Sequence, residues 1–289
     1  MSIIASPASA TSFTTETSGL GSTPFGPFTM RWAESGPPGA RRFLLLHGIY
    51  AGAHSYEWRD LVPLLASQAR VRVPDLLGAG ESDRPDLDYT SDIVQAVVDR
   101  LIDDAGPDVH VVASSLTGAY ALRSLARGVH AASLTLITPS GLGAKREQQR
   151  QRRSRKLYDT VRRTPAGGLL VEALTSKPSV TWFQKNRTYR DPTVLTDAEV
   201  VETRRAGRLS GARHLQLAFV FDRLSIDVST DDIKSVEPTV IWADGQKFVA
   251  ATEADRWAAG GARLVRVTSG LPQVEQPLLL AGLLLAAHS

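Results

Sequence analysis

The side chains that could do chemistry follow two short apolar runs in the first half of the chain. Tyr50 and His54 come after "RRFLLLHG", while Ser114 ends the run "VHVVAS" and Ser115 follows it, where a helical pattern begins. If these runs are strands of one parallel sheet, their carboxyl ends meet at the same edge, where loops commonly line ligand sites. A serine at such an edge can act as a nucleophile when a base lies within hydrogen-bond reach.

The elements that must position these side chains alternate along the chain. Short β-rich runs are separated by helical patterns such as "SDIVQAVVDRLIDDAG", which is typical of an α/β fold. The predicted strands are "FTMRWAE", "RRFLLLHG", "ARVRVPDL", "VHVVAS", "ASLTLIT", "PTVIWAD" and "ARLVRVT". The later runs are almost continuously apolar, which indicates a mostly parallel sheet covered by helices on both faces.

The alternation of strands and helices stops between Ser140 and about Ile233, where helical patterns rich in Arg and Leu take over. We therefore predict an α/β core domain from 25–140 and 234–289. Residues 141–233 are predicted to form a helical cap, or lid, over the carboxyl edge of the sheet. The Ser/Thr/Ala-rich residues 1–24 are predicted to be a flexible tail and lack the features of a signal peptide.

Five segments in order resemble those of the α/β-hydrolase fold, specifically the capped branch that contains epoxide hydrolases, haloperoxidases and esterases. They are "LLLHGIYAGAHSYEWRDLVPLLA", "RVPDLLGAGESDRP", "VHVVASSLTGAYAL", "PTVIWADGQKFVA" and "LPQVEQPLLLAGLLL". The resemblance covers roughly Phe28 to Ala287 and matches the predicted cap only loosely. It implies a helix-covered, mostly parallel sheet with a site at its carboxyl edge.

By this resemblance Ser115 occupies the nucleophile position of the G-x-S-x-G turn, and the backbone N–H groups of Ile49 and Leu116 would form the oxyanion hole. Both flanking glycines of the turn are replaced, the second of them by β-branched Thr117, which is expected to crowd the turn. The acid position of the family triad falls on Gln246, with Asp244 two residues earlier. The base position falls on Gly270.

Because the base is missing, we consider substitutes among nearby polar residues. His54 lies in the loop after the His-Gly pair, and Asp244 could act as a base if a dry pocket raised its pKa. The predicted pocket is lined by Tyr50, His54, Ser114, Ser115, Asp244, Gln246, Gly270, Trp182 and Phe183, although Trp182 could equally pack inside the cap. A histidine placed at position 270 is expected to point towards Ser115.

Loss of triad members costs about 10⁴ to 10⁶ in turnover, or roughly 5–8 kcal/mol, so ordinary ester hydrolysis is disfavoured. The sequence therefore favours a lyase, cyclase or isomerase without cofactor, acting on a small apolar carbonyl compound such as a polyketide-like natural-product intermediate. Two alternatives stay open. One is a serine esterase or hydrolase with a surrogate base, and the other is a non-catalytic small-molecule binding protein.

The composition indicates which kinds of ligand and partner the protein is expected to bind. The chain has no cysteine and six scattered histidines, which predicts neither a disulfide framework nor a metal site. No apolar run is long enough to span a membrane, and the cytoplasm is the expected location. Net charge is +3, but the run Lys145–Arg163 alone carries +7. This run is interpreted as a solvated helix face or as a dock for an acidic acyl carrier protein; no nucleic-acid motif accompanies it.

Overall fold

The computed structural model describes residues 19–142 and 155–287. Its sheet has eight strands in the order β1-β2-β4-β3-β5-β6-β7-β8. The strands are β1 (Gly19–Phe25), β2 (Phe28–Ser35), β3 (Arg42–Leu46), β4 (Arg70–Pro74), β5 (Val109–Ser114), β6 (Ser133–Ile137), β7 (Thr239–Ala243) and β8 (Arg263–Val267). Strands β4, β3, β5, β6, β7 and β8 run parallel, whereas β2 pairs antiparallel with β1 and β4. The predicted α/β fold is confirmed, and the seven predicted runs are β2 to β8.

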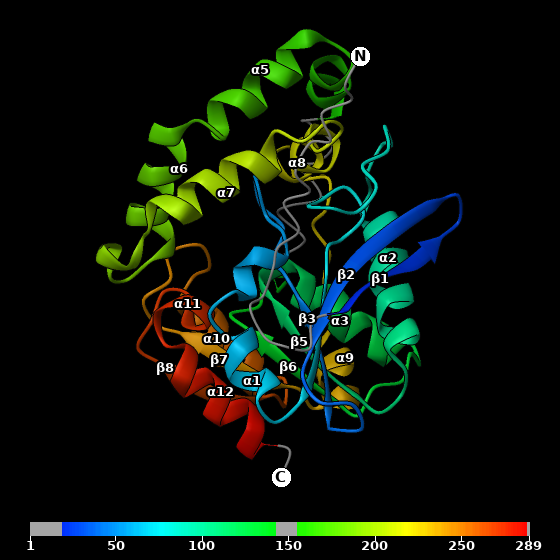
Figure 1. Ribbon diagram of the computed structural model, residues 1–289, viewed down its shortest axis with the longest axis vertical. Coiled ribbons are helices and arrows are strands. Elements are labelled where there is room, and N and C mark those ends of the chain that lie inside the picture. Colours follow the sequence, from blue (N-terminus) through cyan, green and yellow to red (C-terminus); the bar gives the residue numbers. More distant parts are fainter. Residues whose placement is uncertain (1–18, 143–154, 288–289) are drawn as a thin grey trace, which may run out of the picture.

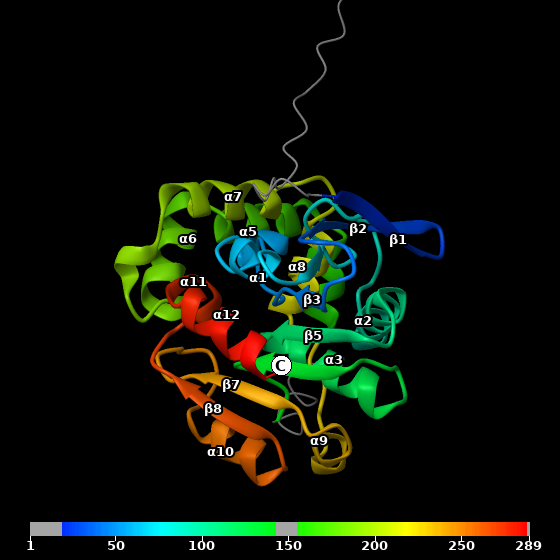
Figure 2. The same cartoon turned by 60° about the horizontal axis from the view of Figure 1, so that its bottom comes forward.

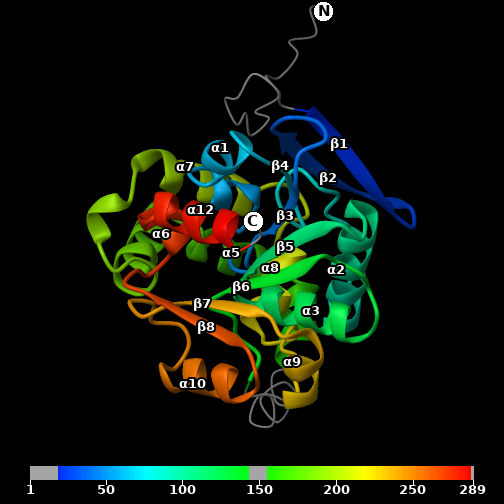
Figure 3. The same ribbon diagram turned by 90° about the horizontal axis from the view of Figure 1, so that it is seen from below.

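Helices cover both faces of this sheet (Figure 3). The helices of the core are η1 (Ser55–Trp58), α1 (Val62–Ala66), α2 (Ser91–Ala105), α3 (Ser115–Ala126), α9 (Thr230–Val236), α10 (Thr252–Ala259), α11 (Pro272–Glu275) and α12 (Pro277–Ala286). Alternate strand residues point to opposite faces. Phe43 and Leu45 therefore pack with α1 and α12, while Leu44 and Leu46 pack with α2, α3 and α10. Both cores are apolar, which fixes the strand register and holds the carboxyl ends of the strands at one edge.

A second group of helices lies above the carboxyl ends of the parallel strands (Figure 1). These helices are α5 (Pro165–Leu174), α6 (Lys177–Phe183), the π-helix η2 (Gln184–Thr188), the short η3 (Pro192–Val194), α7 (Asp197–Gly207) and α8 (Arg213–Val220). We call α5 to α8 the cap helices. Helix α9 packs on α3 through buried Ile233, so the helices above the sheet end before Thr230 and not at the predicted 233. The division into domains otherwise stays a prediction.

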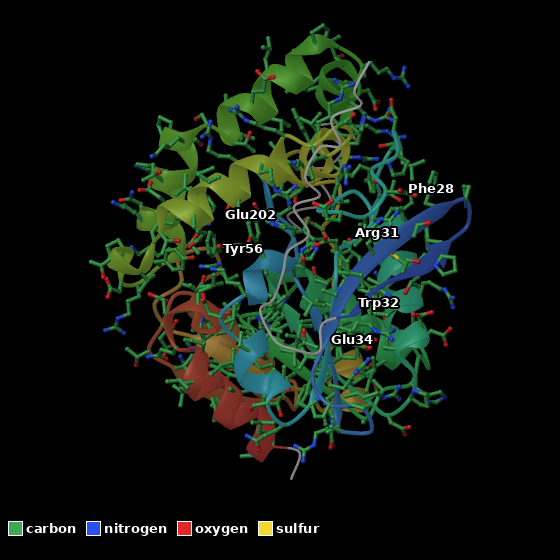
Figure 4. The ribbon with its side chains drawn as sticks, viewed as in Figure 1. Phe28, Arg31, Trp32, Glu34, Tyr56 and Glu202 are labelled. Atoms are coloured by element: carbon green, nitrogen blue, oxygen red, sulfur yellow. The ribbon has the colours of Figure 1, made fainter. Side chains whose placement is uncertain are left out.

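The predicted flexible tail 1–24 is wrong for its last residues, because Gly19–Phe25 form strand β1. The segment "GLGSTPF" contains the glycine, serine and proline residues that are typical of loops, and proline is tolerated in an edge strand. Gly21 lies under the ring of Trp32, which Figure 4 places on β2; a Cβ atom at position 21 would lie 2.2 Å from that ring. Pairing with β2 and packing on Trp32 therefore stabilise β1 as a strand, although its own residues do not favour one. Among the described residues, no helix is long and apolar enough to cross a bilayer.

Candidate active site

Ser115 lies at the junction of β5 and α3 with a strained backbone. Strand β5 ends at Ser114, which is the N-cap of α3, and Ser115 has a φ angle of 54°. A non-glycine residue at positive φ costs of order 1 kcal/mol or more and persists only where its surroundings impose it. The side chain of Ser115 has no hydrogen-bond partner among the described residues and lines a cavity. The turn therefore presents Ser115 as the resemblance predicts.

Two backbone N–H groups beside Ser115 are available to a ligand. Leu116 lies in the first turn of α3, where N–H groups have no acceptor within the helix. The N–H of Ile49 has no acceptor in the described part of the chain, and both residues line the same cavity as Ser115. Such a pair can bind a carbonyl oxygen and stabilise the negative charge that develops on it.

Thr117 does not distort this arrangement. Its hydroxyl is buried and donates a hydrogen bond of 2.7 Å to the carbonyl of His47, which joins the serine turn to the loop that carries Ile49. The ring of His47 accepts from the N–H of Leu76 at Nε2 and lies 2.7 Å from the carbonyl of Gly48 at Nδ1, so Nδ1 carries the proton. Burial lowers the pKa of His47 and keeps the ring neutral. His47 and Thr117 therefore act as braces for the oxyanion loop.

The cavity has a volume of about 330 Å³, and Phe183, Gln184 and Thr188 extend its wall above the sheet. Of the residues predicted from the sequence, eight line it: Ile49, Tyr50, Ser114, Ser115, Leu116, Phe183, Gln246 and Gly270. Three do not, and these are His54, Trp182 and Asp244. The catalytic or binding roles of the eight stay predictions.

The base position at Gly270 is occupied by backbone from above. A Cβ atom at Gly270 would lie 2.2 Å from the carbonyl oxygen of Thr188 and 2.6 Å from the backbone nitrogen of Arg190. Real Cβ atoms do not approach backbone so closely, so no side chain fits here without moving the segment 188–190. The expectation that a histidine at 270 would point towards Ser115 is therefore wrong for this structure.

The surrounding loop keeps its family pattern because of Glu275. Its Oε2 accepts hydrogen bonds from the hydroxyl of Ser269 at 2.7 Å and from the N–H groups of Gly270 and Leu271. Its Oε1 accepts from the N–H of Asp191 at 2.8 Å. Glu275 thus closes the loop after β8. It also binds the segment 188–191, which lies below the cap helices, to this loop. The two meet beside α11 (Figure 2).

The acid position is also occupied by a structural side chain. The amide oxygen of Gln246 accepts from the N–H groups of Phe248 and Val249, and its nitrogen donates to the carbonyl of Val249 at 2.7 Å. Gln246 therefore shapes its own loop. Asp244 lies outside the cavity, where it pairs with Arg266 at 2.7 Å. The prediction of Asp244 as a catalytic base is wrong, because its loop directs the carboxylate to the surface.

His54 is likewise directed away from Ser115. Its Nδ1 lies 3.0 Å from the carbonyl of Gly52, its Nε2 lies 3.1 Å from Oε1 of Glu202, and the side chain is buried. Figure 4 shows Glu202 on α7 above Tyr56 of η1, whose ring stacks on that of His54. Burial alone would raise the pKa of Glu202, but hydrogen bonds from His54 and Arg205 lower it to about 2. His54 therefore links the core to α7 and does not supply the missing base.

Of the two predicted cap aromatics, only Phe183 reaches the cavity. Its ring packs on Phe248 with centroids 5.5 Å apart, and both rings line the cavity wall. Trp182 is 60% exposed and contacts neither the cavity nor a packed cap core. Consecutive helix positions face directions about 100° apart, so the two aromatic residues cannot share one role.

Sequence reasoning missed several polar residues of the cavity wall, among them two carboxylates and an amide. Glu57 of η1 is buried, Gln184 begins the π-helix, and Asp222 follows α8 with a φ angle of 60°. The Oε1 of Gln184 and the Oδ2 of Asp222 are buried without a partner among the described residues. The only signal in the sequence was the position of Glu57 in the segment "HSYEW", close to the predicted oxyanion loop. Neither spacing nor periodicity singles out the other two.

Tyr50 brings a hydroxyl to the same wall. Burial, assisted by the nearby charge of Glu57, raises its pKa well above 10, so the phenol stays protonated and can donate a hydrogen bond. The charged side chains among the described lining residues are Glu57 and Asp222, with no lysine, arginine or histidine. The cavity therefore suits a ligand without a negative charge. No group of three metal-ligating side chains occurs within the described ranges.

Residues 145–154 of the basic run Lys145–Arg163 lie outside the described residues. In the described part, Arg162 pairs with Asp86, and Tyr158 is buried. The dock for an acidic acyl carrier protein stays a prediction.

Comparison with known proteins supports the fold described above. A model of the family described as "Alpha/beta hydrolase family" matches residues 43–283. The 2-hydroxy-6-oxo-6-(2'-aminophenyl)hexa-2,4-dienoic acid hydrolase of Metapseudomonas resinovorans is 41% identical over 63 residues, which is 22% of this chain and 21% of that protein. The 2-hydroxy-6-oxo-6-phenylhexa-2,4-dienoate hydrolase of Burkholderia cepacia is 27% identical over 220 residues, 71% of each chain. This chain thus matches only about a fifth of the first of these relatives.

Among solved structures, the serine hydrolase CarC, involved in carbazole degradation, superposes with a TM-score of 0.74 at 20% identity. The match covers 93% of this chain and 98% of that one. At this level of identity the likeness concerns the fold.

We expect Gly270→Ala to lower the free energy of unfolding by about 1–3 kcal/mol, because the added methyl group meets the backbone of Thr188 and Arg190. Gly282→Ala is the matched control. Gly282 lies in α12 with nothing within 4 Å of an added Cβ, so alanine should stabilise by up to about 1 kcal/mol. Urea denaturation measures both. A Gly270→Ala protein as stable as the parent would show that the segment does not fill the base position.

Glu202→Gln should destabilise the protein in a pH-dependent way. The pKa of Glu202 in the folded state, about 2, lies below the ordinary glutamate pKa of 4.5. Its contribution is therefore present above pH 4.5 and is lost as pH falls towards 2. We expect a loss of about 1–3 kcal/mol at neutral pH that shrinks below pH 4.5. Glu172→Gln, at an exposed position of α5, should show neither effect. A pH-independent loss in Glu202→Gln would contradict the ionic role.

Proposed function

Because the chain belongs to the alpha/beta hydrolase family, we propose that it is an enzyme that acts on a small, largely apolar carbonyl compound held at Ser115. The N–H groups of Ile49 and Leu116 bind the carbonyl oxygen, and Phe183 and Phe248 contact the apolar part. The observation that carries this proposal is the strained Ser115 beside two N–H groups without acceptors. A backbone cost of this kind is typical of a site that aims a group at a ligand.

Hydrolysis is the reaction that the relatives favour. The two relatives named above are hydrolases of oxo-dienoates, and the family match covers residues 43–283. We propose that this protein cleaves a bond next to a carbonyl with water, on a substrate without a carboxylate. The wall offers Glu57 and Asp222 where an anionic substrate would need a cation.

A cofactor-free lyase, cyclase or isomerase is the second candidate. It is favoured by Gly270 and Gln246, since neither can take the part of the triad histidine or aspartate. A cavity that binds a carbonyl oxygen without a triad can stabilise an enolate or orient a flexible chain for an intramolecular step. A natural-product intermediate as its substrate stays a prediction.

Two ester probes of equal size test the charge preference. We expect slow hydrolysis of p-nitrophenyl butyrate, and at least about tenfold lower kcat/KM for p-nitrophenyl succinate, whose free carboxylate would face Glu57 and Asp222. Equal turnover of the two esters would contradict the proposed preference for substrates without negative charge. Reaction in water labelled with oxygen-18 separates the two candidate functions. Hydrolysis places one labelled oxygen in the acid product of the native substrate, whereas a lyase, cyclase or isomerase places none.

The same preparation tests the role of Ser115. Without a histidine base, a fluorophosphonate should leave Ser115 unmodified over the time in which it labels an ordinary serine hydrolase completely. Ser115→Ala should then lower turnover of p-nitrophenyl butyrate by less than about a hundredfold, which is the scale of one lost polar contact. Rapid stoichiometric labelling of Ser115, seen by mass spectrometry of the intact protein, would show that it is a covalent nucleophile after all.

A further inference from the structure

We propose that Glu57 is the general base of this site, a role that rests on the proposed carbonyl chemistry and that replaces the missing histidine. Glu57 lies on η1, in the connection from β3 to α1, and not on either loop that carries the family acid or base. Its side chain is buried and lines the cavity together with Ser115, Ile49 and Leu116.

The position of the carboxylate follows from the packing around Gly48. A Cβ atom built on Gly48 would lie 3.4 Å from Cβ of Ser115, 3.5 Å from Oε2 of Glu57 and 3.6 Å from Cε1 of Tyr50. These three side chains therefore surround one small space beside the oxyanion loop. A base must lie within direct hydrogen-bond reach of the proton that it takes, or one water away. Because Glu57 lines the same cavity as Ile49 and Leu116, we place the attacking water between its carboxylate and the carbonyl that these two N–H groups hold.

The hydrogen bonds of Glu57 leave it free to accept a proton. Oε2 accepts from the N–H of Gly48 at 3.0 Å, and Oε1 accepts from Nε2 of Gln273 at 2.7 Å. An ionised carboxylate has about four acceptor positions, so half of them stay open. Both donors are neutral, and no lysine, arginine or histidine of the described chain forms an ion pair with Glu57. Tyr50, which stays protonated, and His47, which stays neutral, lie close to Glu57. A second small cavity brings His54, Arg59, Tyr189 and Glu199 near the same carboxylate, and there Arg59 pairs with Glu199.

Leaving a carboxylate buried without a counter-charge is costly, and structures keep such groups mainly where they have a function. The two bonds also fix the side chain. The bond from Gly48 ties the carboxylate to the residue just before Ile49, so base and oxyanion donor move together. By contrast, Asp222, the other carboxylate of the wall, accepts a hydrogen bond from Ser225, which follows α8 and is far in sequence from the oxyanion loop. Of the two carboxylates, Glu57 is therefore the one that is bound to the oxyanion loop.

The step balances without any added group. Water attacks the carbonyl carbon, one of its protons passes to Glu57, and the carbonyl oxygen becomes an oxyanion bound by Ile49 and Leu116. Glu57 is then neutral, so the oxyanion does not face a second negative charge. When the oxyanion reforms the carbonyl, the bond to the leaving group breaks and the leaving group takes the proton from Glu57. The products are a carboxylic acid and the protonated leaving group.

Glu57→Gln tests this role with little change of structure. The Oε1 of Gln273 is buried without a partner, so its amide can turn and accept from the new side-chain NH₂, while the new Oε1 still accepts from Gly48. With p-nitrophenyl butyrate as the probe, we expect kcat to fall by about 10²–10⁴-fold with KM little changed.

A binding measurement makes the test independent of turnover. 1,1,1-Trifluoro-4-phenylbutan-2-one is a small apolar ketone that forms a hydrate, and one hydroxyl of the hydrate can donate to an ionised Glu57. Fluorine NMR titration should give a Kd for Glu57→Gln about tenfold or more above that of the parent, which is the scale of one charge-assisted hydrogen bond. Glu202→Gln, which changes a half-buried carboxylate outside the cavity, should change neither Kd nor kcat.

The outcomes separate the two proposals. Unchanged kcat and Kd in Glu57→Gln overturn the role of Glu57 while leaving carbonyl chemistry intact, and so does a larger loss of kcat in Asp222→Asn. A parent protein that neither binds the ketone nor hydrolyses any neutral ester overturns the proposed function itself, and the role of Glu57 falls with it. If Glu57→Gln does not fold, Glu57→Asp keeps the charge but shortens its reach. An unchanged kcat in that variant overturns the role.

Discussion

The contact between the segment 188–191 and two glycines below it determines what this site can be. Gly270 leaves room for the backbone of Thr188 and Arg190, while Gly245 leaves room for the side chain of Arg190, whose Cβ would otherwise lie 2.7 Å from an added methyl group. Glu275 then bonds both to the loop after β8 and to Asp191. One contact therefore sets the height of the π-helix η2 above the sheet, places Thr188 in the cavity wall and excludes a side chain from the base position.

This contact gives the cavity its unusual charge distribution. A histidine and aspartate pair would bring one ionisable base and its stabilising acid to Ser115. Here both positions carry neutral groups that bind backbone, and the charges of the wall are two carboxylates on other elements. The positive charges near the cap lie outside the cavity, where Arg59 pairs with Glu199 and Arg205 with Glu202. Proton transfer in the cavity must therefore begin with a carboxylate, a phenol or the substrate itself.

The sequence predicted the backbone positions of the site better than the directions of its polar side chains. Motif order placed Ser115, Ile49 and Leu116 correctly around one cavity, because these positions depend on strand ends and backbone, which the fold determines. The sequence wrongly predicted that Asp244, His54 and Trp182 line the cavity, because the direction of a side chain depends on partners far away in the sequence. Asp244 turns to Arg266, and His54 turns to Glu202 on α7. Strand β1 was missed for a similar reason, since its stability comes from pairing with β2.

The retained pattern around Gly270 has a structural cause. In a chain with a histidine at this position, Pro272 and Glu275 would be read as supports of the base. Here Glu275 makes four hydrogen bonds without any base present, and they close one loop and hold another. The motif therefore persists because the fold needs the carboxylate to satisfy buried backbone N–H groups, a need that does not depend on catalysis. The backbone of Thr188 and Arg190 lies where a side chain at position 270 would begin. The proposed base therefore comes from another element, η1, which is joined to the oxyanion loop through Gly48 and whose carboxylate shares the cavity wall with Ser115.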